Sequence, residues 1–330
     1  MSFSRNSVLF IILSILCIIL FLLDILFGGF FIPFSALFDN THETYQYIIL
    51  NFRLPKAITA LVTGAAISLA GLIMQTLFRN PLAEPYVLGI SSGSGLGVAI
   101  FLMASTFLPF ALTQSGWGLI IAAVTGAIVT LLLVLVVSFK VRQAVSLLLV
   151  GIMLGQIAAS LIGILQNYTD PDSLKLYVIW TFGSLAAVTW LYMKVMLPVI
   201  IVGIIIVLII QKSLNGLLLG ENYAQGLGIS IRQTRLLIIL ATALLAGATT
   251  AFVGPVAFIG IAVPHFARRL FYTSNHQIVI PATLLCGGIL LLLCDITSQS
   301  VVPGYTLPIN SVSALVGAPA VIWIILKNKK

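Results

Sequence analysis

The sequence predicts an all-α membrane protein with about ten transmembrane helices, in a single domain that spans residues 1–330. Two observations support this prediction. Of the 330 residues, 60% are hydrophobic and only 7% are charged, whereas about a quarter of the residues in a soluble domain are charged. So few charges cannot cover the surface of a soluble protein of this length. The apolar residues also fall into long runs, which excludes a soluble enzyme, a nucleic-acid-binding domain and a disordered chain.

Ten apolar runs, bounded by glycine, proline or charged residues, mark the predicted helices. The first run follows Arg5 and is not ended by a small-residue cleavage site. We therefore expect an uncleaved helix rather than a signal peptide, with Asp24 at the membrane interface. The eighth run is short and follows a break at Gly254–Pro255. The runs cover residues 8–27, 58–78, 88–107, 117–139, 145–166, 190–211, 234–253, 258–270, 278–299 and 307–326.

The basic residues predict the orientation of these helices. With ten crossings, both ends of the chain lie on one side of the membrane. If that side is the cytoplasm, the outer segments hold four of the 16 basic residues and the inner segments hold the other twelve (16 − 4). The four outer residues are Arg53, Lys56, Lys175 and Lys194. This asymmetry is the one that the positive-inside rule describes, so we expect both termini in the cytoplasm.

Charge and cysteine content predict neither a cofactor nor a metal site. The net charge of +8 comes from basic residues that stand singly between apolar runs, which favours a lipid bilayer over nucleic acid as the partner. The three cysteines, Cys17, Cys286 and Cys294, lie inside apolar runs and lack metal-ligand spacing. We therefore expect them to be small packing residues.

Glycine and proline interrupt the chain between the second and third runs. The segment Asn80–Pro85 contains two prolines, and Gly89–Gly95 follows it with three glycines and three serines. Small residues allow helices to pack closely in lipid, which is one interpretation of these glycines. A broken helix that lines a wet cavity is the other interpretation.

Five stretches between about residue 50 and the C-terminus form an ordered series of motifs. They are Arg53–Leu54–Pro55–Lys56 with Gly64–Ala65–Ala66, Gly71, Gln75 and Asn80–Pro81–Leu82–Ala83–Glu84–Pro85; Trp180 with Gly183–Ser184–Leu185; Leu214–Asn215 with Leu219–Gly220–Glu221, Ala224, Leu227 and Gly228; Gly254–Pro255 with Phe258–Ile259–Gly260, Val263–Pro264–His265 and Arg268; and Asp295 with Leu307–Pro308–Ile309 and Gly317–Ala318–Pro319. In this order they resemble the FecCD/BtuC-type permease subunits of binding-protein-dependent ABC importers for iron chelates, heme and cobalamin.

The resemblance implies a ten-helix subunit of a bacterial or archaeal inner membrane. Such a subunit dimerises around a central pathway, with an identical chain or a paralogue. It works with two cytosolic ATPase subunits and an extracytoplasmic solute-binding protein, and it is not itself an enzyme. The residues agree with this division of labour, because the sequence contains no G-x-x-x-x-G-K-[ST] phosphate loop and no paired intramembrane acids suited to a proton relay. The energy for transport must then come from a partner.

The longest predicted cytoplasmic connection, residues 212–233, contains glycines that can end short helices. By resemblance it is the region that couples the permease to the ATPase. The candidate coupling residues are Gly220, Glu221, Ala224 and Gly228. A solvated connector is the alternative interpretation.

Arg53 and Lys56 stand at the predicted outer mouth of the second run, against the positive-inside trend. By resemblance they meet acidic residues on the two lobes of the binding protein, where charge pairing steers encounter and fixes register. Snorkelling at the interface is the alternative interpretation. Lys56 and Gln299 stand where this family more often has Arg, so a bidentate contact becomes a point charge at residue 56.

Two further groups of residues complete the predicted sites. Candidates for the pathway or its gates are Gln75, Asn80, Ser91, Ser92, Ala144 and Val145, the last two forming an apolar constriction. Structural members of the motifs are Pro81, Pro264, His265, Arg268, Asp295 and Pro308. Asp295 lies inside the ninth run, where a charge is costly, so we expect it to pair with Thr297 or Ser298.

The predicted substrate is an iron chelate, either a ferric siderophore or heme, with cobalamin as the alternative on the same scaffold. All of these ligands already hold their metal, so the pathway needs no metal-binding side chains. An ion-coupled secondary transporter would need acids at the membrane midplane, and only Asp295 comes close. A membrane-embedded enzyme would need a catalytic pair inside the runs, and we find none.

Overall fold

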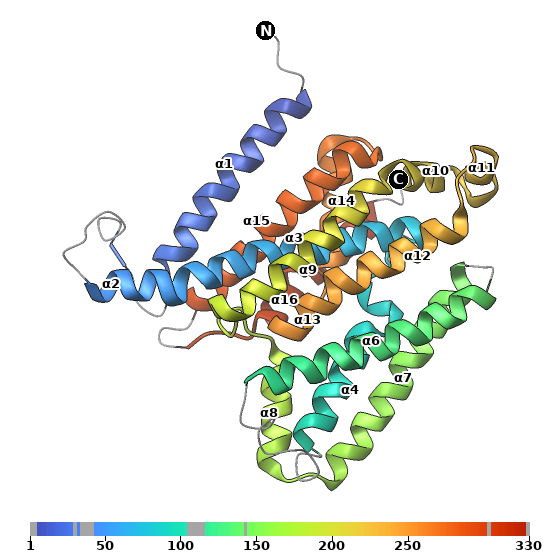
Figure 1. The fold of residues 1–330 in the computed structure, drawn as a ribbon. Helices are drawn as coiled ribbons and strands as arrows, with labels where there is room; N and C mark the ends of the chain where they lie inside the picture. Colours follow the sequence, from blue (N-terminus) through green and yellow to red (C-terminus); the bar gives the residue numbers. More distant parts are fainter. Residues whose placement is uncertain are drawn as a thin grey trace. The chain divides into compact units, whose positions relative to one another are not determined.

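Helices make up all the regular secondary structure in the part of the chain that the computed structural model describes, which is residues 5–28, 32–33, 43–103, 116–141, 144–301 and 305–327 (Figure 1). This confirms the predicted all-α class. The chain divides into two units. One comprises Met1–Leu72, Gly183–Pro198 and Val256–Lys330, and the other comprises Ile73–Phe182 and Val199–Pro255. We call them unit 1 and unit 2.

A helix lies at each of the ten predicted runs, although residues 104–107 of the third run fall outside the described residues. In order they are α1 (Arg5–Leu26), α3 (Leu54–Phe78), α4 (Ile90–Met103), α6 (Gly116–Lys140), α7 (Ala144–Tyr168), α9 (Trp190–Ile209), α12 to α13 (Ile231–Thr242 and Ala248–Val253, joined by the π-helix Ala243–Gly247), α14 (Ile259–Phe271), α15 (His276–Ser300) and α16 (Ile309–Lys327). Within the described residues, seven helices are long and apolar enough to cross a membrane. These helices fit the predicted class of membrane protein.

The structure contains helices that hydropathy did not predict. Before the second run, α2 (Glu43–Ile48) and a π-helical turn (Ile49–Arg53) continue into α3. A further helix, α8 (Pro171–Phe182), lies in the connection before the sixth run. Asp170 caps α8, because its Oδ1 accepts hydrogen bonds from the backbone N–H groups of Ser173 (2.9 Å) and Asp172 (3.1 Å). These bonds hold the pKa of the Asp170 carboxyl below its usual value.

Small residues bring the helices of unit 1 into close contact. A Cβ added at Gly64 on α3 would clash with the carbonyl oxygen of Gly287 on α15, and one added at Gly71 would clash with that of Gly260 on α14. Close backbone approach of this kind lets helices gain van der Waals contact in lipid, where burial alone does not drive association. Gly64 and Gly71 of the second run therefore act in helix packing.

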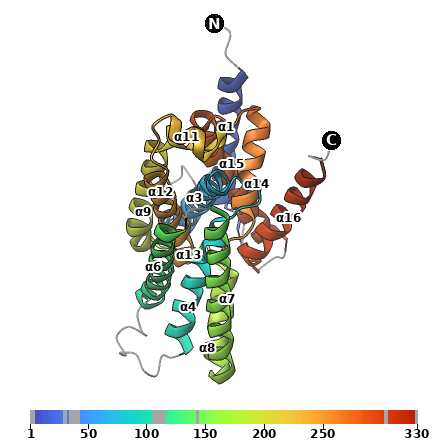
Figure 2. The ribbon, with the colours of Figure 1, turned by 90° about the vertical axis from the view of Figure 1, so that its right-hand side faces the viewer.

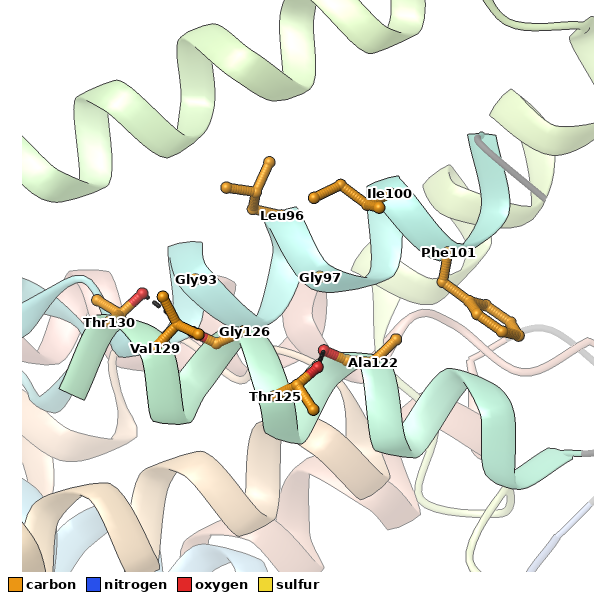
Figure 3. Close-up of a pocket in the computed structure, with 10 residues that line it drawn as sticks. All are labelled: Gly93, Leu96, Gly97, Ile100, Phe101, Ala122, Thr125, Gly126, Val129 and Thr130. Carbon is orange, nitrogen blue, oxygen red and sulfur yellow. Dashed lines mark hydrogen bonds between the residues drawn. The ribbon is translucent and has the colours of Figure 1, made fainter. Parts of the chain in front are cut away.

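Within unit 2, α4, α6 and α7 run beside one another (Figures 1 and 2). A Cβ at Gly97 would clash with the Ala122 carbonyl oxygen, and one at Gly126 with that of Gly93, so α4 and α6 also meet through small residues. A groove of about 340 Å³ remains along this contact (Figure 3). The Thr130 hydroxyl that lines the groove already has a hydrogen-bond partner within α6, since it donates to the Gly126 carbonyl oxygen at 3.0 Å.

We expect Gly71→Ala to lower the thermal stability of the detergent-purified protein, because the new methyl group meets the Gly260 backbone and the two helices must separate. Overpacking of this kind typically costs about 1–3 kcal/mol. The matched control is Gly163→Ala on α7, where an added Cβ meets no atom within 4 Å. The control should match or slightly exceed wild type, because alanine favours helix over glycine. Equal melting temperatures for both variants would refute the packing role of Gly71.

Candidate functional site

Two predicted docking residues, Arg53 and Lys56, lie in a buried group of charges within unit 1. We define the charge cluster as Asp24 from α1, Arg53 from the end of the π-helical turn, Lys56 from the start of α3, and Asp295 and Gln299 from α15. The Lys56 Nζ atom lies 2.7 Å from Asp295 Oδ2 and 3.6 Å from Asp24 Oδ1. One ammonium group therefore lies between two carboxylates from different helices.

Arg53 completes the cluster through neutral acceptors. Its Nη1 donates to the Phe27 carbonyl oxygen at 2.6 Å and to Gln299 Oε1 at 3.0 Å. Gln299 in turn donates from Nε2 to Asp295 Oδ2 at 3.0 Å, so it bridges the guanidinium and the carboxylate. The guanidinium occupies the space that a side chain at Gly28 would need, because an added Cβ there would clash with Arg53 Nη1.

All five side chains of the charge cluster are removed from solvent. Asp24 is 0% exposed, and the other four are between 5% and 8% exposed. Two acids and two bases give a formal charge of zero, which is the condition under which buried charges are tolerated. Removing one partner from such a pair typically costs about 3–5 kcal/mol, because the other charge stays buried and uncompensated.

Asp24 is the least satisfied member of the charge cluster. Within the described residues neither of its carboxylate oxygens accepts a hydrogen bond, and Lys56 is its ion-pair partner at 3.6 Å. Asp24 is fully buried within the protein. The opposite charges of Asp24, on the first apolar run, and Lys56, just before the second, were the available signal for this pairing, because intramembrane charges tend to pair.

The predicted partners of Asp295 are half right. Ser298 donates from its hydroxyl to the Asp295 backbone oxygen at 2.7 Å and lies 3.5 Å from Oδ1. Thr297 instead donates to the Leu293 carbonyl oxygen at 2.7 Å. The reason is helix geometry, since residues three and four apart share a face whereas residues two apart do not. Lys56 and Gln299, which sequence reasoning did not assign to Asp295, contact its carboxylate directly.

The predicted coupling residues lie on two short helices of unit 2, α10 (Gln211–Leu219) and α11 (Glu221–Gly226). We call residues 211–230 the short-helix connection. Gly220 separates the two helices at φ +116°, a conformation that favours glycine. Ala224 is fully buried, whereas Leu219, Tyr223 and Leu227 are more than half exposed.

Two arginines that sequence reasoning did not select attach the short-helix connection to the rest of unit 2. Arg79, which directly follows α3, has φ +48° and donates from Nη2 to the Leu218 carbonyl oxygen at 3.2 Å. Arg235 on α12 pairs with Glu221 at 3.1 Å and donates to the Val141 carbonyl oxygen at 2.9 Å. A movement of the short-helix connection would therefore be transmitted to the end of α3 and to α12 through these contacts.

A hollow of about 820 Å³ lies beside the connection. Residues from the end of α3, the start of α7 and the connection line it, among them Arg79, Val145, Gly220 and Tyr223. The predicted gate residue Val145 is 63% exposed at this hollow. Ala144 begins α7, but its side chain lies outside the described part of the structure.

The other pathway candidates have separate local positions. Asn80 forms a turn after α3, because its Oδ1 accepts from the Leu82 backbone N–H at 2.9 Å next to Pro81. Ser91 and Ser92 are half-buried at the start of α4. Gln75 is buried near the end of α3.

Four of the six structural motif residues lie on α14 or directly before α16, in unit 1. Pro264 is buried inside α14, and His265 and Arg268 are half-buried on the same helix. Pro308 precedes α16, and its carbonyl oxygen accepts from the Val312 N–H at 3.1 Å. Among the described residues, no group of three or more His, Cys, Asp or Glu side chains could hold a metal ion.

Known proteins resemble this chain along nearly its whole length. The hemin transport system permease protein HmuU of Yersinia pestis is 33% identical over 324 residues, which cover 96% of this chain and 95% of that protein. The vitamin B12 import system permease protein BtuC of Salmonella typhi is 34% identical over 286 residues, which cover 86% of this chain and 85% of that protein. A solved transporter described as metal-chelate type, in an inward-facing conformation, matches with a TM-score of 0.87 and 29% identity over 97% of this chain and 99% of that chain.

The family assignment agrees with these relatives. Residues 16–327 match the family described as the FecCD transport family. Each of the five motif stretches falls within this range. The chain belongs to the FecCD transport family, whose members are membrane permease subunits of ABC importers.

Proposed function

We propose that this permease carries an iron chelate, either a ferric siderophore or heme, across a bacterial or archaeal inner membrane. The observation that supports this substrate class best is the full-length structural match to a transporter of the metal-chelate type. The hemin permease HmuU supports heme within that class. Cobalamin is the second candidate, because the vitamin B12 permease BtuC is similar to the same degree.

In this proposal the chain is a ten-helix subunit that forms the translocation pathway with a second permease subunit. Two cytosolic ATPase subunits supply the energy, and an extracytoplasmic solute-binding protein delivers the substrate. The absence of a G-x-x-x-x-G-K-[ST] phosphate loop from the sequence supports this division. Both termini and the short-helix connection then face the cytoplasm, as the positive-inside rule predicts.

The short-helix connection is the proposed contact with the ATPase. Leu219, Tyr223 and Leu227 place exposed apolar side chains on a segment outside the long helices, and such groups of side chains commonly mark protein interfaces. Motion of this segment would reach the end of α3 through the Arg79–Leu218 hydrogen bond. Gly220, Glu221, Ala224 and Gly228 shape the segment, since two of them are glycines with positive φ, Glu221 pairs with Arg235 and Ala224 packs inside.

The charge cluster is the proposed docking region for the binding protein. Arg53 and Lys56 supply two cations at the start of α3, where the predicted outer face lies. Acidic residues of the partner would meet these cations and fix the register of docking. Because both cations are already paired within the chain, docking on them requires an exchange of partners.

Reconstituted transport tests the proposed substrate directly. The tagged chain is purified with its co-purifying ATPase, placed in proteoliposomes and supplied with its binding protein. We expect ATP-dependent uptake of labelled heme or a ferric siderophore, and no uptake without ATP or without the binding protein. Uptake of cobalamin in place of the iron chelates would overturn the substrate assignment. Uptake driven by an ion gradient without ATP would indicate the rival mechanism of a secondary transporter.

Tyr223→Asp tests the proposed ATPase contact. A charge on this exposed side chain should remove most of the co-purifying ATPase and lower ATP-driven uptake at least about tenfold, because a buried unpaired charge is costly at an interface. The matched control is Tyr168→Asp at the end of α7, where the side chain is 85% exposed. Normal ATPase recovery with Tyr223→Asp would contradict the assignment. Ala224 is less suitable for this test, since a bulky residue at a fully buried position would disturb folding.

A further inference from the structure

The charge cluster contains two acids that the docking motif does not include. Asp295 contacts the Lys56 ammonium at 2.7 Å and reaches Arg53 through Gln299. Asp24 comes from α1, a different helix, and lies 3.6 Å from the same ammonium. Lys56 therefore already has carboxylate partners within the chain, and Arg53 reaches the Asp295 carboxylate only through Gln299.

The interaction of Asp24 with the cations differs from that of Asp295. Asp24 is fully buried and, in the described structure, accepts no hydrogen bond through its carboxylate. Its contribution is the Coulombic attraction to the Lys56 ammonium at 3.6 Å, whereas Asp295 lies 2.7 Å from that ammonium and also accepts a hydrogen bond from Gln299. A carboxylate bound in this way can be replaced by another carboxylate without leaving a cation unpaired.

The anchoring of α1 is compatible with such a replacement. At its other end α1 is held independently, because Arg5 donates to the Leu270 carbonyl oxygen at 3.1 Å and its guanidinium lies 4.5 Å from the centre of the Tyr272 ring. Phe10 also packs against Phe271, with ring centres 4.6 Å apart and the rings tilted. The Asp24 end is held by apolar packing as well, because Ile25 belongs to a buried cluster with Ile49 and Ala57, so α1 stays attached at both ends when Asp24 is released.

We propose that Asp24 and Asp295 are internal competitors of the binding protein for Arg53 and Lys56. This inference rests on the proposed docking role of the two cations. In the free permease the internal acids hold the cations, and acidic residues of the docked partner exchange with Asp24 first. The partner carboxylate balances the charge of Lys56, and the displaced Asp24 carboxylate takes up a proton from solvent, so neither state leaves an uncompensated buried charge.

In this exchange Asp24 acts on docking through Lys56, and it lowers the affinity of the permease for the solute-binding protein. A partner shifts an equilibrium between two states only through its difference in affinity for them. The pairing of Asp24 with Lys56 stabilises the undocked state, so its removal favours the docked state. We expect a gain of about tenfold in affinity, within the 5–150-fold range typical of coupled sites. A purely structural role for Asp24 would instead lower the affinity or leave it unchanged.

The experiment measures the affinity of the purified permease–ATPase complex for the solute-binding protein that the uptake assay requires. Asp24→Asn should bind it about tenfold more tightly than wild type, and adding Lys56→Met should abolish the gain. The matched control is Glu43→Gln, which makes the same charge change at an exposed position on α2. It should alter the affinity less than about twofold, because an exposed charge is screened by salt.

An unchanged or weakened affinity of folded Asp24→Asn would overturn the proposal, and so would an equal gain in Glu43→Gln. If Asp24→Asn does not yield folded protein, Gly28→Ala tests the competition at the other cation without a change of charge, because it displaces Arg53 from the Gln299 bridge to Asp295. Its methyl group takes the space of the Arg53 guanidinium and should release that cation for docking. Loss of affinity in Gly28→Ala would then contradict the competition.

Arg53→Gln separates this inference from the docking role on which it rests. If Arg53→Gln leaves the affinity unchanged, the cation does not contact the partner and the docking assignment fails. If Arg53→Gln weakens docking but neither Asp24→Asn nor Gly28→Ala strengthens it, docking stands and internal competition alone is refuted. Lys194→Gln, which removes an exposed cation on α9, controls for the general loss of positive charge.

Discussion

Charges that leave water must be paired, and this requirement organises the end of unit 1 where α1, α3 and α15 meet. Two acids and two bases lie there, none of them more than 8% exposed to solvent, and their formal charges cancel. The pairing explains neighbouring residues as well: Gly28 leaves room for the Arg53 guanidinium, and Gln299 connects that group to Asp295. Helix α1 exposes most of its apolar surface, and this end of it is held by the pairing of Asp24 with Lys56 together with the packing of Ile25 against Ile49 and Ala57.

Close backbone packing is the second constraint, and it gives α3 its role. Gly64 and Gly71 bring α3 against α15 and α14 in unit 1, where a methyl group at either glycine would meet a carbonyl oxygen. The same helix begins with the cations of the charge cluster and ends next to Arg79, which contacts the short-helix connection in unit 2.

The sequence predicted the helices far better than their contacts. Hydropathy depends on residues near in sequence, so the ten apolar runs each contain a helix, whereas α8 was missed although Asp170–Pro171 is a typical helix start. Partners of buried charges are set by which helices meet, and for this reason neither Asp24 nor Asp295 was assigned to Lys56. The burial of Ala224 on α11 was not predicted either, because a 3.6-residue period cannot be read from a six-residue helix.

The account depends most directly on the mutual neutralisation of Asp24 and Lys56, and a double-mutant cycle on the melting temperature of the purified chain measures it. Asp24→Asn and Lys56→Met each leave an uncompensated charge, which we expect to cost about 3–5 kcal/mol. The double variant removes both charges together, so it should recover most of the stability that either single variant loses. Destabilisations that simply add in the double variant would contradict the account, because they would mean that the two side chains do not interact.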